Sequence, residues 1–311
     1  MARFYFSKRR SHEVAVWQRQ IVWRLEAAAI GLLIGFLRVL PLRAAFTCGG
    51  WIGEIVRRFS PRVDKVRRNL RVVFPKASRQ RLERMTRASF ANIGVAMAEL
   101  ANLDRIWRRR DQLVEFNLMP GAHTPGPERP TVFVTAHIGP WQLTPLVSRH
   151  YNFTLPVIYA PEQNPYVDRQ LNRLRQTFDN PLVSRDGGMR MLMSSLNRGE
   201  SIGMTVDTRL DSGEAVPFFG YPAMTNTAPA RLALRYDCDL VPVLAERLPN
   251  GRFRVNIHPP IVSDPEADRD TRALDMSRQI NELFETVIVR NPDQWLCLKR
   301  RWPKNIYRQH A

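Results

Sequence analysis

The chain has 311 residues, of which 44% are hydrophobic and 24% are charged. This length allows one large domain or two ordinary ones, and the composition is typical of a packed globular protein rather than a disordered one. Its three cysteines lie far apart without a CxxC pair, which argues against a disulfide framework and a cysteine zinc site and favours a reducing compartment.

The formal net charge of +18 is concentrated at the two ends of the sequence. Residues 1–80 carry 17 basic and 4 acidic side chains, and residues 299–311 carry 5 basic and no acidic ones. Residues 81–298 carry 25 of each sign, so this long middle stretch is neutral. Because it is neutral and contains no recognised nucleic-acid-reading motif, we predict that the protein does not bind nucleic acid.

Near the amino terminus, residues 27–37 form an apolar run of eleven residues that follows several cations. A bilayer span needs about 20 apolar residues, and extending the run would include Arg38, Pro41 and Arg43. A cleaved signal peptide fits poorly, because the run begins late and has no clear small-x-small cleavage site. We therefore predict a helix that lies on an anionic membrane surface, with a buried core helix as the alternative.

Downstream, patterns typical of helices and strands alternate. Residues 79–100 place apolar side chains at helical spacing, and TVFVTAH at 131–137 is typical of a buried strand. Further helices are predicted at 166–176, 187–198, 227–236 and 271–289, further strands at 181–184, 201–207, 238–248 and 252–260, and an exposed aromatic loop at 216–227. This alternation predicts a layered α/β domain at residues 61–311, which follows a basic membrane-associated segment at residues 1–60.

Two polar residues stand at the ends of predicted strands. His137 ends TVFVTAH before a Gly-Pro turn, and Asp207 ends SIGMTVD. Ligands of α/β sheets bind at the carboxyl ends of strands, and a histidine there can take a proton from an alcohol. We expect His137 to be a base, with a hydrogen-bonded structural role as the alternative. We expect Asp207 to line the same cleft, with a helix-capping or turn aspartate as the alternative.

Other short motifs carry less weight. Residues 199–203 match GxSxG, but a predicted helix precedes Ser201 and a strand follows it, which is the reverse of a nucleophile elbow. No GxxxxGK[ST], GxGxxG or HExxH motif is present, so nucleotide binding and zinc protease chemistry have no motif support. We predict no catalytic role for Ser201 and no bound metal or cofactor.

Six segments taken in order resemble the lipid A late acyltransferases, the lauroyl and myristoyl transferases of Gram-negative inner membranes. The segments are RRNLRVVFP at 67–75, HIGPWQ at 137–142, QNPYVDRQLNRLR at 163–175, LNRGESIGMTVD at 196–207, VPFFGYPAMTNT at 216–227 and PDQWLCLKRRWPK at 292–304. The resemblance implies an acyltransferase-type sheet flanked by helices, with an amino-terminal membrane-associated helix. It also implies acyl transfer from acyl carrier protein to a hydroxyl of a lipid A precursor or related glycolipid, without a metal or cofactor, at the cytoplasmic face of the inner membrane.

The resemblance also assigns roles to individual residues. His137 matches the family's catalytic base. Arg173, Arg175 and Arg185 match basic positions that would meet lipid phosphates or the phosphopantetheine of the carrier. Asn164 belongs to the NPxxD segment, for which packing and substrate contact are both open.

One departure from the family pattern concerns the residue five positions after His137. The family has Asp or Glu there, whereas this chain has Gln142. An amide can orient a histidine through its carbonyl oxygen but cannot stabilise the imidazolium by charge, and a carboxylate-to-amide change in a protease triad costs about 10⁴ in rate. Three interpretations stay open: an acyltransferase with an amide-oriented base, a catalytically impaired relative that binds membrane lipid without turnover, or an inactivating engineered substitution.

Overall fold

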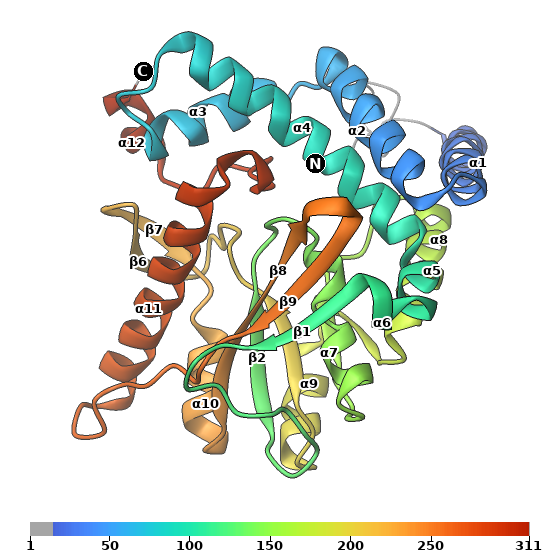
Figure 1. The fold of residues 1–311 in the computed structure, drawn as a ribbon. Helices are drawn as coiled ribbons and strands as arrows, with labels where there is room; N and C mark the ends of the chain where they lie inside the picture. Colours follow the sequence, from blue (N-terminus) through green and yellow to red (C-terminus); the bar gives the residue numbers. More distant parts are fainter. Residues whose placement is uncertain (1–14, 311) are drawn as a thin grey trace.

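The computed structural model describes residues 15–310, and within them seven strands form the central sheet, which helices cover on both faces (Figure 1). The strand order is β1-β9-β8-β2-β5-β3-β4, and all neighbours are parallel except β8 and β9. The strands are β1 Val114–Leu118, β2 Thr131–Thr135, β3 Val157–Tyr159, β4 Leu182–Ser184, β5 Ile202–Thr205, β8 Asp239–Leu248 and β9 Arg252–Ile257. This architecture confirms the predicted layered α/β fold. Residues 1–14, part of the predicted basic segment, lie outside the described residues.

The side chains of the sheet alternate between two hydrophobic cores. In β2, Val132 and Val134 point into one core, whereas Phe133 points into the other. Helices α9 (Met189–Asn197), α10 (Ala228–Tyr236) and α11 (Arg269–Arg290) cover the first core, and α5 (Leu103–Arg108), α7 (Leu146–His150) and α8 (Pro165–Arg175) cover the second. The remaining helices are α1 Val16–Val39, α2 Leu42–Phe59, α3 Val63–Val73, α4 Arg79–Ala101, α6 Arg110–Leu113 and α12 Lys304–Gln309.

The segment at 216–227, expected to be an exposed loop, is most of a β-hairpin. Strands β6 (Glu214–Phe218) and β7 (Tyr221–Thr225) pair antiparallel outside the main sheet. The two turn residues, Phe219 and Gly220, have φ angles of 51° and 74°, as a two-residue type I′ turn requires. The two strands were not predicted because they contain Pro217 and Pro222, and proline within a run argues against a central strand. In the structure these two prolines face each other in a two-stranded ribbon, in which both strands are edge strands.

Helix α1 is longer than its apolar run suggested. It has 24 residues, because it begins at Val16, and within the described residues it is the one helix that is long and apolar enough to cross a membrane by length and composition. It is also seated along the α/β body, since Glu26, Ala27 and Leu37 are buried. The alternative of a buried core helix does not describe α1, because most of its large apolar side chains remain exposed.

Polar contacts fix the first half of α1 to α8. Asn164, the N-cap of α8, donates from Nδ2 to the carbonyl oxygen of Trp23 at 2.9 Å and to Glu26 Oε2 at 3.1 Å. Gln170 donates to the carbonyl oxygen of Ala27 at 3.0 Å. The side-chain amide of Asn164 therefore caps the start of α8 and also binds α1 to it.

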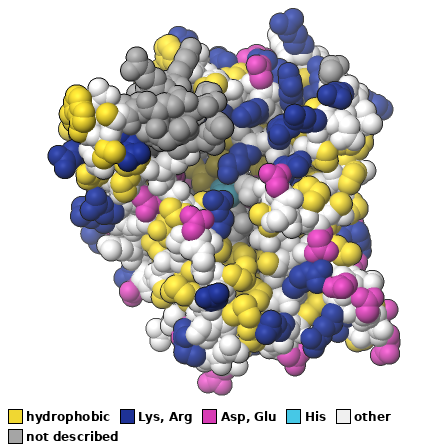
Figure 2. All heavy atoms as spheres, turned by 180° about the vertical axis from the view of Figure 1, so that it is seen from behind, with side chains coloured by type: hydrophobic (Ala, Val, Ile, Leu, Met, Phe, Trp, Pro, Cys, Tyr) yellow, Lys and Arg dark blue, Asp and Glu magenta, His cyan; other side chains and the backbone are white. Residues whose placement is uncertain are grey.

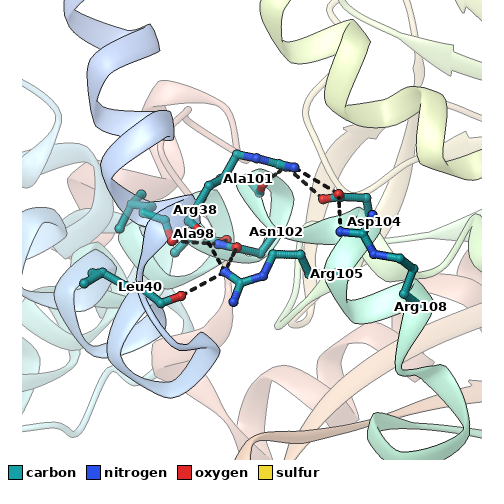
Figure 3. Close-up of polar contacts among 9 residues, drawn as sticks. Arg38, Leu40, Ala98, Ala101, Asn102, Asp104, Arg105 and Arg108 are labelled. Atoms are coloured by element: carbon teal, nitrogen blue, oxygen red, sulfur yellow. Dashed lines mark hydrogen bonds and ion pairs between the residues drawn. The ribbon is translucent and has the colours of Figure 1, made fainter.

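A second group of contacts fixes the end of α1 to the junction of α4 and α5 (Figure 3). Arg38 forms a bidentate ion pair with the carboxylate of Asp104, with N–O distances of 2.8 and 2.9 Å. The side-chain amide of Asn102 donates a hydrogen bond to the carbonyl oxygen of Leu37. Arg105 donates to the carbonyl oxygens of Arg38 and Leu40, both at 2.8 Å. Because these bonds satisfy carbonyls that a helix end leaves unpaired, they stabilise the end of α1 as well as its docking.

Helices α2 and α4, which lie next to each other in Figure 1, pack so closely that the backbone of one contacts the backbone of the other. A Cβ atom at Gly94 would lie 1.9 Å from the carbonyl oxygen of Gly49, and one at Gly53 would lie 2.2 Å from that of Phe90. Both helices therefore need glycine at this crossing. This packing joins residues 42–59 to the α/β body; a boundary at residue 60 stays a prediction.

We predict that Gly94→Ala lowers the free energy of unfolding by about 1–3 kcal/mol, because a rigid backbone atom must move to admit the methyl group. Gly35→Ala is the matched control, since it is also a helical glycine but has no atom within 4 Å of the added Cβ. Higher helix propensity should leave that variant unchanged or slightly more stable. Chemical denaturation measures both, and equal stability of the two variants would contradict the close-packing account.

Candidate active site

His137 lies just beyond β2 in a tight turn. The amide of Ile138 donates to the carbonyl oxygen of Ala136 at 2.7 Å, and Gly139 follows with a φ of 58°. A Cβ at Gly139 would lie 2.8 Å from the carbonyl oxygen of Ala245, so both conformation and space call for glycine. The turn thus ends the strand and presents the imidazole at the carboxyl edge of the sheet.

Asp207 meets His137 from the neighbouring strand. The amide of Val206 donates to the carbonyl oxygen of Thr135, which continues the β2–β5 pairing as far as the site. Asp207 Oδ1 lies 2.7 Å from His137 Nδ1, and its side chain is 1% exposed against 28% for the histidine. The structure therefore brings together the two residues predicted from their strand-end positions, and the carboxylate is the buried partner.

Trp295 completes a hydrogen-bonded series. Its indole Nε1 donates to Asp207 Oδ2 at 3.1 Å, and the side chain is buried. Its backbone neighbours are joined to the histidine turn, because Leu296 donates to the carbonyl oxygen of His137 and Gly139 donates to that of Gln294. The segment after α11 therefore holds both the histidine and its carboxylate partner.

The environment of Asp207 favours its ionised form. Burial by itself would raise the pKa of the carboxyl group, but the charge and hydrogen bonds of His137 and the indole of Trp295 outweigh burial, and the pKa lies below its ordinary value. A carboxylate that stays ionised can accept the Nδ1 proton of His137. That bond leaves Nε2 free to accept a proton from another molecule.

A cavity of about 760 Å³ opens beside this pair. Its buried lining is mostly apolar and includes Leu37 of α1, Phe133, Leu155, Val167, Leu171 and Phe178. Its exposed lining includes four cations, Arg62, Arg185, Lys299 and Arg300. Figure 2 shows Lys and Arg side chains around a hollow in which a histidine is visible. The site therefore joins an apolar interior to a cationic rim.

The residues predicted to bind substrate fall into two groups. Arg175 and Arg185 line the cavity, and burial lowers the pKa of Arg175, whose guanidinium lies 5.9 Å from the ring of Tyr159. Arg173 is exposed and does not line the cavity, and Asn164 is engaged in the α1–α8 junction. For Asn164 the structure therefore favours the packing alternative.

The structure does not place Gln142 where the sequence suggested. Gln142 lies in the short helix Trp141–Leu143 and lines the cavity, but within residues 15–310 no hydrogen bond joins it to His137. The physical reason is that Asp207 already occupies Nδ1, the nitrogen that an orienting group uses. The expectation that Gln142 orients the base is corrected accordingly.

Ser201 has a structural role, as its reversed motif context indicated. It follows α9 and precedes β5, and its hydroxyl accepts a hydrogen bond from the amide of Thr131 at 3.1 Å. It is buried and does not line the cavity. The order of helix and strand is the one predicted.

Residues 8–304 match the family model described as bacterial lipid A biosynthesis acyltransferase. The chain belongs to the bacterial lipid A biosynthesis acyltransferase family. It is 20% identical over 257 residues to a lipid A biosynthesis acyltransferase of Haemophilus influenzae, covering 80% of this chain and 77% of that protein. It is 24% identical over 274 residues to the lipid A biosynthesis palmitoleoyltransferase of Escherichia coli, covering 85% and 86%.

Among solved structures, the chain is similar to the 1-acyl-sn-glycerophosphate acyltransferase PlsC of Thermotoga maritima, with a TM-score of 0.36 and 15% identity. The match covers 85% of this chain and 98% of that one.

Within this acyltransferase family member, Trp295 is a site residue that the sequence did not indicate. It lies in a segment that carries the family resemblance, but 88 residues separate it from its partner Asp207. No local pattern indicates such a contact. Its neighbours Gln294 and Leu296, which are hydrogen-bonded to Gly139 and His137 of the histidine turn, bring it to the site.

We predict that the destabilisation caused by Trp295→Phe shrinks as pH falls. Loss of the indole donor raises the pKa of Asp207, so Asp207 of the folded variant takes up a proton at a higher pH than Asp207 of the folded parent. In the parent, the ionised carboxylate stabilises the fold at neutral pH. That contribution is lost when the pH falls through the lowered pKa. Trp302→Phe is the matched control, because that buried indole donates to the carbonyl oxygen of Phe218 instead. The pKa of Asp207 in the parent lies below its ordinary value of about 3.9, so melting temperatures are measured from pH 7 down to about pH 3. Parallel pH profiles of the two variants would contradict the assignment.

Proposed function

We propose that this protein moves a fatty acyl chain from an acyl carrier protein thioester to a hydroxyl of a lipid A precursor or similar glycolipid. The observation that carries the proposal is the series His137–Asp207–Trp295 beside an apolar cavity with a cationic rim. Attack of an alcohol on a thioester needs a base, stabilisation of the oxyanion and two positioned substrates. Family membership supports the same class of reaction.

In this proposal His137 is the general base. Asp207 holds Nδ1 and thereby leaves Nε2 to take the proton of the acceptor hydroxyl as its oxygen attacks the thioester carbon. The buried carboxylate then stabilises the imidazolium that forms. His137 returns the proton to the departing thiolate, so the base is regenerated after one transfer.

The cavity suits the two substrates by its chemistry. Its apolar interior matches a fatty acyl chain, whose transfer from water is favourable by about 0.8 kcal/mol per buried CH₂. The exposed cations of the rim match anionic groups, and arginine forks suit phosphate in particular. Lipid phosphates and the phosphopantetheine of an acidic carrier both present such groups.

The position of Asp207 also argues against the alternative that the protein is a catalytically impaired relative that binds lipid without turnover. That interpretation was motivated by the amide at position 142, which leaves the histidine without the family's carboxylate. Asp207 supplies a buried carboxylate at 2.7 Å from Nδ1, so the motive for the alternative is removed. We therefore propose a catalytically competent enzyme.

We further propose that α1 lies in the interface of an anionic membrane, at the cytoplasmic face of the inner membrane. The body-facing side of α1 is fixed by polar contacts in its first half and at its carboxyl end, so a perpendicular span would draw α8, with its charged side chains, into the bilayer. The opposite side exposes large apolar side chains, namely Trp17, Ile21, Leu25, Leu32, Phe36 and Val39. Such a face, beside a basic segment, is typical of interfacial helices.

Replacing Leu32 and Phe36 by serine should weaken binding to phosphatidylglycerol-rich vesicles by about 10- to 100-fold, because the variant loses apolar area that enters the interface. Neither residue lines the cavity, so melting temperature should change little. Val262→Ser with Val289→Ser is the matched control, since these valines are 74% and 54% exposed but lie outside α1. Vesicle sedimentation measures both, and an equal loss in the control would contradict the assigned face.

For catalysis, Asp207→Asn should lower kcat by about 10³- to 10⁴-fold, because the amide favours the wrong tautomer and does not stabilise the imidazolium. Gln142→Glu should change kcat by less than about ten-fold, because Asp207 already orients the base. The assay incubates purified protein with several acyl carrier protein thioesters and lipid A precursors and detects one added acyl chain by mass. A large gain from Gln142→Glu, with Asp207→Asn neutral, would return the orienting role to position 142; no product from the parent would refute the proposed function.

A further inference from the structure

Thr135, the last residue of β2, carries a hydroxyl that the fold leaves unpaired. Its Oγ1 is buried, and within residues 15–310 it has no hydrogen-bond partner. Thr131, at the start of the same strand, is satisfied, because its Oγ1 donates to the carbonyl oxygen of Arg129 at 2.9 Å. Of these two threonines of one strand, only the one at the site end therefore has an unused donor.

An unpaired buried hydroxyl works against folding. Taking such a group out of water without a partner is unfavourable, and valine has nearly the same shape and suits a strand as well. Stability alone therefore favours valine at position 135. Departures of this kind are expected at functional sites, where a residue contacts a ligand as well as its own fold.

The backbone fixes Thr135 between the two site residues. It lies two positions before His137, and its carbonyl oxygen accepts the amide of Val206, which precedes Asp207. By strand alternation its side chain shares a face with Phe133, and both residues line the cavity. Thr135 therefore stands where the apolar cavity meets the histidine.

We propose that the hydroxyl of Thr135 donates a hydrogen bond to the carbonyl oxygen of the bound acyl thioester and stabilises the oxyanion formed on it. This inference rests on the proposed function. An acyl chain that fills the cavity has its carbonyl group at the end nearest His137, which is the end where Thr135 lies. A donor already in place needs no reorganisation when charge develops on the oxygen.

The electron and proton balance of the step is complete with these groups. The acceptor oxygen forms a bond to the thioester carbon while its proton passes to His137, and the carbonyl π electrons move to the oxygen that Thr135 contacts. When the tetrahedral intermediate collapses, those electrons re-form the carbonyl, the carbon–sulfur bond breaks, and the proton on His137 passes to the thiolate. Thr135 keeps its own proton throughout.

The test compares Thr135→Val, Thr135→Ser and the matched control Thr131→Val in the acyl transfer assay, with melting temperatures for all. Thr135→Val should lower kcat by about 10²- to 10³-fold with KM within about three-fold, because the bond is strongest in the transition state. Its melting temperature should equal or exceed that of the parent. Thr135→Ser, which keeps the hydroxyl, should retain kcat within a few-fold.

Thr131→Val should show the reverse pattern, with a lower melting temperature and a kcat close to the parent, because it loses a satisfied bond far from the site. The proposal is overturned if Thr135→Val keeps its kcat within three-fold, if its loss lies in KM alone, or if Thr135→Ser is as impaired as Thr135→Val. An inactive parent would instead refute the proposed function, and with it this inference.

Discussion

The contact between His137 and the buried carboxylate of Asp207 is the interaction on which the site depends. The central sheet positions both residues, because each lies just beyond the end of one of two adjacent parallel strands. A histidine on a tight turn has several rotamers and two tautomers, and only a fixed acceptor at Nδ1 selects one of each. The carboxylate is itself fixed by a second donor, the indole of Trp295.

Behind this pair, a buried polar network holds the segment that supplies Trp295. Arg247 of β8 contacts both oxygens of Glu99 in α4, at 2.6 and 2.8 Å, and donates to Asn92 of the same helix. Asn92 in turn donates to the carbonyl oxygen of Gln294, which also accepts the amide of Gly139. Because a buried ion pair gains little net stability, we infer that its value here is geometric: α4 and β8 hold Gln294 against the histidine turn.

The sequence contains enough local information to predict the site's first two residues but not the third. His137 and Asp207 follow apolar runs that are readable as strands, and parallel strands bring such ends to one edge. Trp295 bonds to Asp207 across 88 residues, and nothing in its own neighbourhood indicates that partner. The role expected for Gln142 came from its family position, and the actual partner of Nδ1 was visible only once the neighbouring strand was placed.

The fold was predictable to a similar extent. Helix α4 and strand β2 have clear periodicity, whereas the β6–β7 hairpin was hidden by prolines that a two-stranded ribbon tolerates. The length of α1 was underestimated because Arg19, Arg24 and Glu26 interrupt its apolar character; of these, Glu26 is buried against the body and contacts Asn164 of α8. Burial of a charged side chain such as Glu26 depends on tertiary contacts, and the local amino-acid composition does not indicate them.

Nitrogen-15 NMR of the imidazole ring at pH 8 tests whether Asp207 holds His137 with Nε2 free to act as a base. His137 signals are identified by their absence in His137→Gln. We expect a proton on Nδ1, shifted downfield by its bond to the carboxylate, and an unprotonated Nε2, with the Nδ1 proton signal lost in Asp207→Asn. A neutral ring protonated at Nε2, or a spectrum unchanged by Asp207→Asn, would contradict this arrangement.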